Sequence, residues 1–248
     1  MSVFVVTLGL MIGSFLNVCI YRIPRKISIL YPGSHCPRCK TRLKPRDLIP
    51  MLSYILTKAK CRYCGEGISP RYPLVELMNG LIYLLLYHYF GFTLTFLQYA
   101  VLSSLLLVIA WIDYDLQIIP DELMLFGLLV GTMLYVFRHD GMLWRNGLIG
   151  LLIGGGIFLL IAVVSKGAMG GGDIKLMGVL GYWLGGQYIL LITLLSFVIG
   201  AVFSILLLLL KIKGRKDMIP FGPFIAMAAF ITIIYGESII YWYLLKFL

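Results

Sequence analysis

The stretch YILLITLLSFVIGAVFSILLLLL, residues 188–210, contains no charged side chain. A helix of this length crosses the hydrocarbon core of a bilayer, which requires about 20 apolar residues. Of the 248 residues in the chain, 60% are hydrophobic and only 13% are charged, whereas a soluble domain has about 25% charged residues. The composition therefore excludes a cytosolic enzyme, a disordered tail and a secreted disulfide scaffold, and it predicts an all-α polytopic membrane protein.

Further apolar runs lie on both sides of this stretch, and together they predict about eight transmembrane helices, with seven or nine as alternatives. The predicted spans are 1–20, 73–90, 94–112, 119–137, 145–165, 174–186, 188–210 and 219–246. The span at 174–186 is short, and Gly236-Glu237 interrupts the last one. We interpret Met1–Ile20 as a retained helix, because it has neither a basic region before the apolar run nor an A-x-A-like cleavage site.

One connecting segment, residues 21–72, carries the whole excess of positive charge. The chain has 21 Lys and Arg against 11 Asp and Glu, a net charge of +10, and this segment holds 12 of the basic and 2 of the acidic residues. Basic connections stay in the cytoplasm, so we expect a cytoplasmic segment with both termini outside. We predict three parts: a first transmembrane helix (1–20), a cytoplasmic basic domain (21–72) and a transmembrane domain (73–248). The basic residues are expected to contact membrane lipids and no nucleic acid.

Two C-x-x-C pairs lie in the basic segment, separated by 21 residues. They consist of Cys36, Cys39, Cys61 and Cys64. Each pair is expected to fold a tight turn that presents two thiolates to one ion, which predicts a small zinc-knuckle insertion with a structural, four-cysteine zinc site. A stable disulfide is not expected, since the cytoplasm keeps thiols reduced. The alternatives to zinc are therefore free reduced thiols or a redox pairing of the cysteines. We expect His35 to be a spacer and Cys19 to be a small buried residue.

Two acidic residues, Asp113 and Asp173, are predicted to lie at the same cytoplasmic edge of the membrane. Facing carboxylates can share one proton, so that the ionised group activates a water and the protonated group donates to a peptide carbonyl. The triglycine 170–172 before Asp173 would allow positive φ values and the close approach of an extended substrate. Alternatively, the two aspartates have no catalytic role and instead cap helices or form ion pairs with Lys166 or Lys175.

Several short motifs are spread along nearly the whole chain. They are Gly13-Ser14-Phe15-Leu16-Asn17-Val18, Tyr21-Arg22-Ile23-Pro24, the four cysteines, Tyr72-Pro73-Leu74-Val75-Glu76-Leu77, Asp113-Tyr114-Asp115 with Ile119-Pro120-Asp121, and Gly170-Gly171-Gly172-Asp173-Ile174-Lys175-Leu176. In this order they resemble the bacterial type IV prepilin peptidases, which are aspartyl proteases of the GxGD type.

This resemblance implies cleavage of the basic leader of type IV prepilins and pseudopilins after a Gly, at the cytoplasmic face of the bacterial inner membrane, in the service of pili or protein secretion. It implies that Asp113 and Asp173 are the catalytic pair, with Asp115 as the rival for the first position. The active-site loop would consist of Gly170, Gly171, Gly172, Lys175 and Asp115. Relatives with the four cysteines also N-methylate the new terminus with S-adenosylmethionine, whose binding site no motif locates in this chain.

The charge of the implied substrate raises a difficulty, because a basic leader and a basic cytoplasmic segment repel each other within about 8 Å at physiological salt. Recognition of the leader is therefore predicted to use acidic residues, namely Glu66, Glu76, Asp115, Asp121 and Glu122. An alternative function is an ion-coupled transporter or channel with Asp113 and Asp173 as a relay, although such proteins tend to place ionisable groups mid-span. A membrane-anchored zinc scaffold without catalysis is the third alternative.

Overall fold

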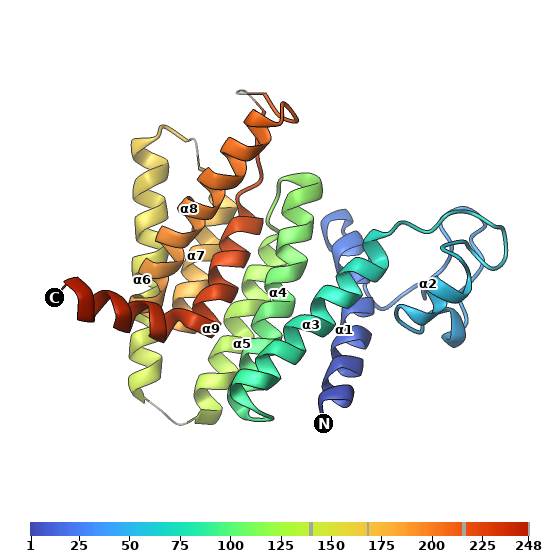
Figure 1. Ribbon diagram of the computed structural model, residues 1–248, viewed down its shortest axis with the longest axis horizontal. Coiled ribbons are helices and arrows are strands. Elements are labelled where there is room, and N and C mark those ends of the chain that lie inside the picture. Colours follow the sequence, from blue (N-terminus) through green and yellow to red (C-terminus); the bar gives the residue numbers. More distant parts are fainter. Residues whose placement is uncertain (139–140, 168, 215–216, 248) are drawn as a thin grey trace. The chain divides into compact units, whose positions relative to one another are not determined.

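The computed structural model describes residues 1–138, 141–167, 169–214 and 217–247. Within this part of the chain every named element is a helix, which confirms the predicted all-α class. The elements are α1 (Ser2–Arg22), η1 (Ile23–Arg25), η2 (Pro45–Asp47), α2 (Leu52–Leu56), α3 (Arg71–Phe90), α4 (Leu94–Leu116), α5 (Asp121–Arg138), α6 (Gly141–Val164), α7 (Gly171–Leu184), α8 (Gly186–Leu209) and α9 (Gly222–Phe247) (Figure 1). Positions 139, 140, 168, 215, 216 and 248 lie outside the described residues.

Each of the eight predicted spans coincides with a helix, but the structure does not confirm eight membrane crossings. Among the described residues, five helical stretches are long and apolar enough to cross a bilayer: Ser2–Arg25, Leu94–Leu116, Trp144–Val164, Gly186–Leu209 and Gly222–Lys246. Helix α7 has 14 residues, so it extends only about 21 Å at 1.5 Å per residue, less than the roughly 30 Å of a hydrocarbon core. Helix α9 runs without a break through Gly236-Glu237, so the predicted interruption is wrong.

The chain divides into two compact units, Met1–Val108 and Ile109–Leu248, and the division falls within α4. In the first unit, α1 packs closely against α3. A Cβ atom added to Gly9 would lie 2.8 Å from Cα of Gly80, and one added to Gly13 would lie 2.7 Å from Cα of Glu76. Small residues let membrane helices approach this closely, so the two glycines determine where α1 meets α3.

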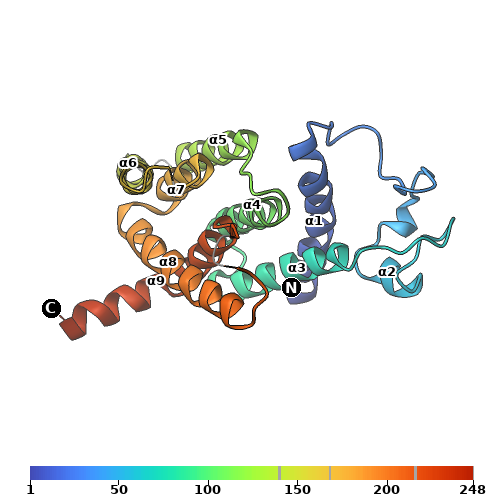
Figure 2. The ribbon, with the colours of Figure 1, turned by 90° about the horizontal axis from the view of Figure 1, so that it is seen from above.

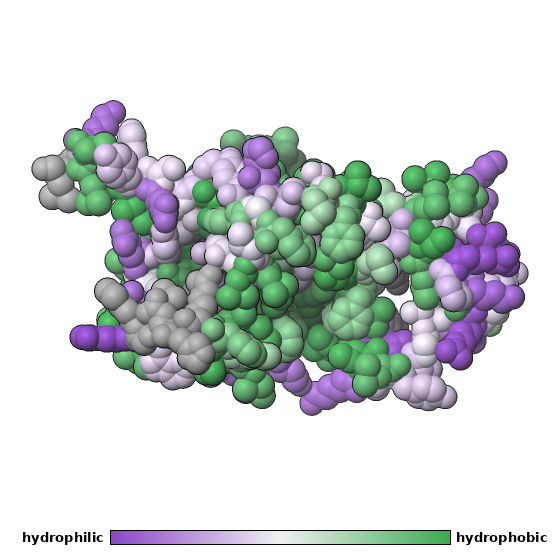
Figure 3. Space-filling model, turned by 90° about the horizontal axis from the view of Figure 1, so that it is seen from below, coloured by the Kyte–Doolittle hydropathy of each residue, from purple (hydrophilic) through white to green (hydrophobic). Residues whose placement is uncertain are grey.

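Polar side chains fasten the same pair of helices. The Asn79 side chain donates a hydrogen bond to the Gly9 carbonyl at 2.7 Å, and the Asn17 side chain donates one to the Tyr72 carbonyl at 3.1 Å. Both asparagines are buried, where an unmade hydrogen bond is costly. These bonds therefore fix the register of α3 on α1. Figure 3 shows hydrophobic side chains over the long helices and hydrophilic ones gathered over the segment that carries α2.

In the second unit, α7 is the central helix and contacts α5, α6, α8 and α9 (Figure 2). Its closest neighbour is α6, against which Gly181 packs on Gly150 with no room for a side chain on either residue. The Trp183 side chain donates a hydrogen bond to the Gly127 carbonyl at 2.9 Å and fastens α7 to α5. The short α7, whose first turn contains Asp173, is thus held by neighbours on several sides.

Candidate active site and metal centre

Asp113 is buried near the end of α4, with only 6% of its surface exposed. Its carboxylate Oδ2 accepts a hydrogen bond of 2.8 Å from the backbone N–H of Gly222, the first residue of α9. Helix N-termini carry a partial positive charge that favours an anion. The beginning of α9 therefore supports a carboxylate that lies 109 positions earlier in the chain.

Asp173 lies in the first turn of α7 and is half-buried. Its backbone N–H donates to the carbonyl of Gly170 at 3.1 Å. Asp173 and Asp113 are close enough for a repulsive electrostatic interaction between their carboxylates. The structure thus brings together the two aspartates that the sequence analysis selected.

The triglycine before Asp173 acts through its small size and not through backbone conformation. None of the three glycines has a positive φ, so that expectation is wrong. A Cβ atom on Gly172 would lie 2.8 Å from Cβ of Ile119, and one on Gly170 would lie 3.2 Å from Oδ2 of Asp173. Gly172 allows α7 to begin against Ile119, and Gly170 leaves room for the Asp173 carboxylate.

Neither aspartate is explained by an ion pair. Lys175, a candidate partner for Asp173, instead donates to both carboxylate oxygens of Asp121, at 2.7 and 2.9 Å. Among the described residues, no ion pair to Asp113 or Asp173 is formed. Asp115 is exposed whereas Asp113 is buried, as expected for two positions that face different sides of a helix.

Gly222 is the residue of this site that the sequence analysis missed. A Cβ atom at this position would lie 2.8 Å from Oδ2 of Asp113 and 3.2 Å from its Cβ and Cγ. The chain just before α9 is also held near the end of α4, because the side chain of Gln117, the residue after α4, donates to the Met218 carbonyl at 3.1 Å. The signal in the sequence was a glycine between Pro220 and Pro223, which marks a helix start but does not point to Asp113.

The four cysteines of the basic segment form a compact cluster, with all four Sγ atoms within 4.8 Å of one another. Each pair lies in a tight turn: the N–H of Lys40 donates to the Cys36 carbonyl at 3.0 Å, and the N–H of Gly65 to the Cys61 carbonyl at 2.9 Å. The Sγ atoms of Cys36 and Cys64 are 3.8 Å apart, close to the tetrahedral edge that Zn–S bonds of about 2.3 Å produce. The cluster therefore fits a metal ion with four thiolate ligands.

The pKa values of the cysteine thiols are shifted in opposite directions. Hydrogen bonds from Thr41 lower the pKa of the Cys39 thiol to about 6, which favours the thiolate that binds metal, whereas desolvation raises the pKa of the Cys64 thiol to about 12. All five cysteines of the chain are free thiols, so no disulfide competes for them. His35 bonds the Gly33 carbonyl through Nδ1 at 3.1 Å and is not a member of the cluster, in agreement with its prediction as a spacer.

Three of the acidic residues suggested for recognition of a basic leader have protein partners. Glu66 pairs with Arg38, and Asp121 pairs with Lys175. Glu76 is buried, and its Oε2 accepts the backbone N–H of Met51 at 2.8 Å. The other two suggested residues, Asp115 and Glu122, are exposed.

Two family models match this chain. The model described as "Bacterial Peptidase A24 N-terminal domain" matches residues 7–90, and the one described as "Type IV leader peptidase family" matches residues 100–205. A "Prepilin leader peptidase/N-methyltransferase" of Bacillus subtilis is 35% identical over 237 residues, which cover 95% of each chain. Proteins of the same name from Pseudomonas aeruginosa and Legionella pneumophila are 34% and 32% identical, over 96% and 95% of this chain and 92% of each relative. No solved structure matches.

Proposed function

Because the chain belongs to the type IV leader peptidase family, we propose that it removes the basic leader of type IV prepilins or pseudopilins and then N-methylates the new terminus. It is a multi-pass membrane protein of the bacterial inner membrane. The relatives named above give no support to a transporter or channel. The basic residues concentrated in 21–72 favour an orientation with this segment and the active site at the cytoplasmic face.

Asp113 and Asp173 are the catalytic pair in this proposal, and the observation that carries it is that a buried and a half-buried carboxylate lie within electrostatic reach of each other, with no ion pair to either among the described residues. In this proposal the two carboxylates share a single proton, as in the aspartic proteases. The ionised carboxylate takes a proton from a water molecule whose oxygen attacks the carbonyl carbon of the scissile peptide. The protonated carboxylic acid donates its proton to the carbonyl oxygen. When the tetrahedral intermediate collapses, the C–N bond breaks and the leaving amine takes up a proton.

The remaining residues of the site would support this pair. Gly222 would orient Asp113 through its backbone N–H, and Gly170 and Gly172 would leave the space in which Asp173 lies. Asp115 is exposed, and we assign it no part in the chemistry. The four cysteine thiolates would hold zinc as a structural ion, since four protein ligands leave no open coordination position. S-adenosylmethionine would supply the methyl group of the second reaction, and we assign no residues to it.

The test compares three isosteric variants in membranes supplied with a prepilin. Asp113→Asn and Asp173→Asn should abolish cleavage, whereas the matched change Asp115→Asn should leave it at the wild-type rate. Methylation of a mature pilin supplied without its leader should continue in all three, which shows that the variants are folded. Cleavage by either of the first two variants would refute the assignment of the pair.

A further inference from the structure

The segment between α1 and α3 exposes apolar side chains in a part of the chain that is otherwise strongly basic. These side chains gather in and just before α2, and we call them the α2 patch: Leu48, Ile49, Leu52, Ile55 and Leu56. Ile55 and Leu56 are 64% and 68% exposed, so the segment itself does not cover them. Leu52, Ile55 and Leu56 are spaced i, i+3 and i+4, which places them on one face of the helix.

Hydrogen bonds hold α2 beside the first turns of α3. The backbone N–H of Met51, directly before α2, donates to the carboxylate of Glu76 in α3 at 2.8 Å. The start of α3 is fastened in turn to α1 by the bond between Asn17 and the Tyr72 carbonyl. Because Glu76 packs against Gly13 of the membrane span Ser2–Arg25, α2 is held beside this span. Figures 1 and 2 show α2 beside the first turns of α3.

The positive charge of the segment indicates what kind of surface can bind over the α2 patch. Residues 21–72 contain only two acidic residues, and each is engaged by an arginine: Asp47 by Arg62 at 2.8 Å, and Glu66 by Arg38. Lys58 and Lys60, directly after α2, are exposed, and the segment as a whole has 12 basic residues against these two acidic ones. A second copy of this basic segment, or a basic leader peptide, would be repelled, whereas anionic lipid head groups would be attracted.

We propose that the α2 patch is an interfacial anchor, which inserts into the head-group region of an anionic bilayer and holds the cysteine-bearing segment against the membrane. An apolar face beside basic residues is the pattern by which amphipathic helices bind membrane surfaces. The anchor would restrain the segment between two points, the bond to Glu76 and the lipid contact. This inference does not depend on the proposed catalytic activity.

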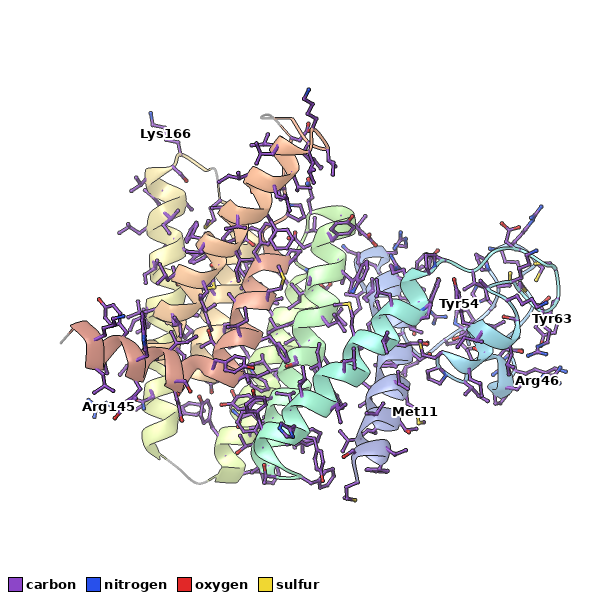
Figure 4. The ribbon with its side chains drawn as sticks, in the orientation of Figure 1. Met11, Arg46, Tyr54, Tyr63, Arg145 and Lys166 are labelled. Atoms are coloured by element: carbon purple, nitrogen blue, oxygen red, sulfur yellow. The ribbon has the colours of Figure 1, made fainter. Side chains whose placement is uncertain are left out.

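The test places a photoreactive benzophenone amino acid at one position of the full-length protein in lipid nanodiscs. At Leu56, in the patch, illumination should attach lipid. At Arg46, which is exposed and projects away from α3 (Figure 4), attachment should be at least about fivefold lower. The adducts are identified by the mass of the intact protein, and both positions are exposed, so neither replacement should disturb folding.

The lipid composition tests the role of charge. Replacing anionic phosphatidylglycerol with zwitterionic phosphatidylcholine should lower the adduct yield at Leu56 at least about fivefold. A cross-linked dimer, a cross-link within the chain or no adduct at Leu56 would overturn the anchor. Equal yields in the two lipid compositions would overturn the assignment to an anionic surface.

Discussion

The contact between Gly222 and Asp113 makes Gly222→Ala the most informative single change in this protein. The added methyl group would lie 2.8 Å from Oδ2 of Asp113 and 3.2 Å from its Cβ and Cγ, so either the carboxylate or the beginning of α9 must move. The movement would weaken the hydrogen bond of 2.8 Å that Gly222 donates. A hydrogen bond to a charged group contributes about 1.5–3 kcal/mol, and about 1.4 kcal/mol corresponds to a tenfold change in rate. We therefore expect kcat for leader cleavage to fall by about 10- to 100-fold.

The assay measures kcat and KM separately, with a purified prepilin and the enzyme in proteoliposomes. Gly222 contacts the proposed catalytic carboxylate and not the substrate, so KM should stay near the wild-type value. The matched control is Gly156→Ala in α6, where nothing lies within 4 Å of the added Cβ. In a helix interior that change should be neutral or slightly stabilising, by up to about 1 kcal/mol.

Two outcomes would contradict the role of Gly222, and a third would show that the variant is not folded. Cleavage by Gly222→Ala at the wild-type rate would show that the N–H of Gly222 does not position Asp113. An equal loss of activity in Gly156→Ala would show that any glycine replacement in this unit disturbs the enzyme. Loss of methylation of a mature pilin in Gly222→Ala would show that the variant had misfolded and that its kcat says nothing about Asp113.

Other expected outcomes concern the cysteine cluster, the surface ion pair and the acid response of the cysteine-bearing segment. Cys36→Ser or Cys61→Ser should release zinc, measured by metal analysis of the purified protein, and should reduce methylation more than cleavage; unchanged metal content would contradict a four-thiolate site. Lys175→Ala should leave the midpoint of thermal unfolding near that of the wild type, because an exposed ion pair such as Lys175–Asp121 contributes less than about 1 kcal/mol. The Tyr63 hydroxyl, with Arg62, lowers the pKa of Asp47, and a lowered carboxyl pKa gives stability that is lost as the pH falls. Tyr63→Phe should therefore move the acid-induced opening of residues 45–64, followed by hydrogen exchange, to higher pH, and an unchanged profile would show that this hydroxyl is not responsible.

Much of the fold and part of the site could be predicted because the signals are local. An apolar run forms a helix from bonds within itself, so all eight predicted spans coincide with helices. The two C-x-x-C turns are also local, and the short bonds from Lys40 and Gly65 within them are what such turns require. The number of membrane crossings could not be predicted in this way, because α7 is a helix of only 14 residues and its position depends on the helices packed around it.

The partners of individual charges could not be predicted, because they depend on how each helix is rotated against the next. Lys175 was a candidate partner of Asp173, yet it bonds Asp121 from a position two residues further along α7. Glu76 was a candidate for binding a basic leader, yet it is buried against α1 and holds the backbone of Met51. The triglycine was expected to supply positive φ values, yet it supplies space beside Ile119.

A helical membrane protein with a basic, cysteine-bearing segment and two candidate catalytic aspartates could be inferred from the amino-acid sequence alone. Apolar runs, charge counts and ligand spacings are properties of neighbouring residues, and each carries its physical meaning without the rest of the chain. The folded chain adds that Asp113 lies within electrostatic reach of Asp173 and that Gly222 donates to Asp113 from the start of α9. These interactions join residues 60 and 109 positions apart, and they arise because glycines let the helices pack closely enough to bring those backbones together.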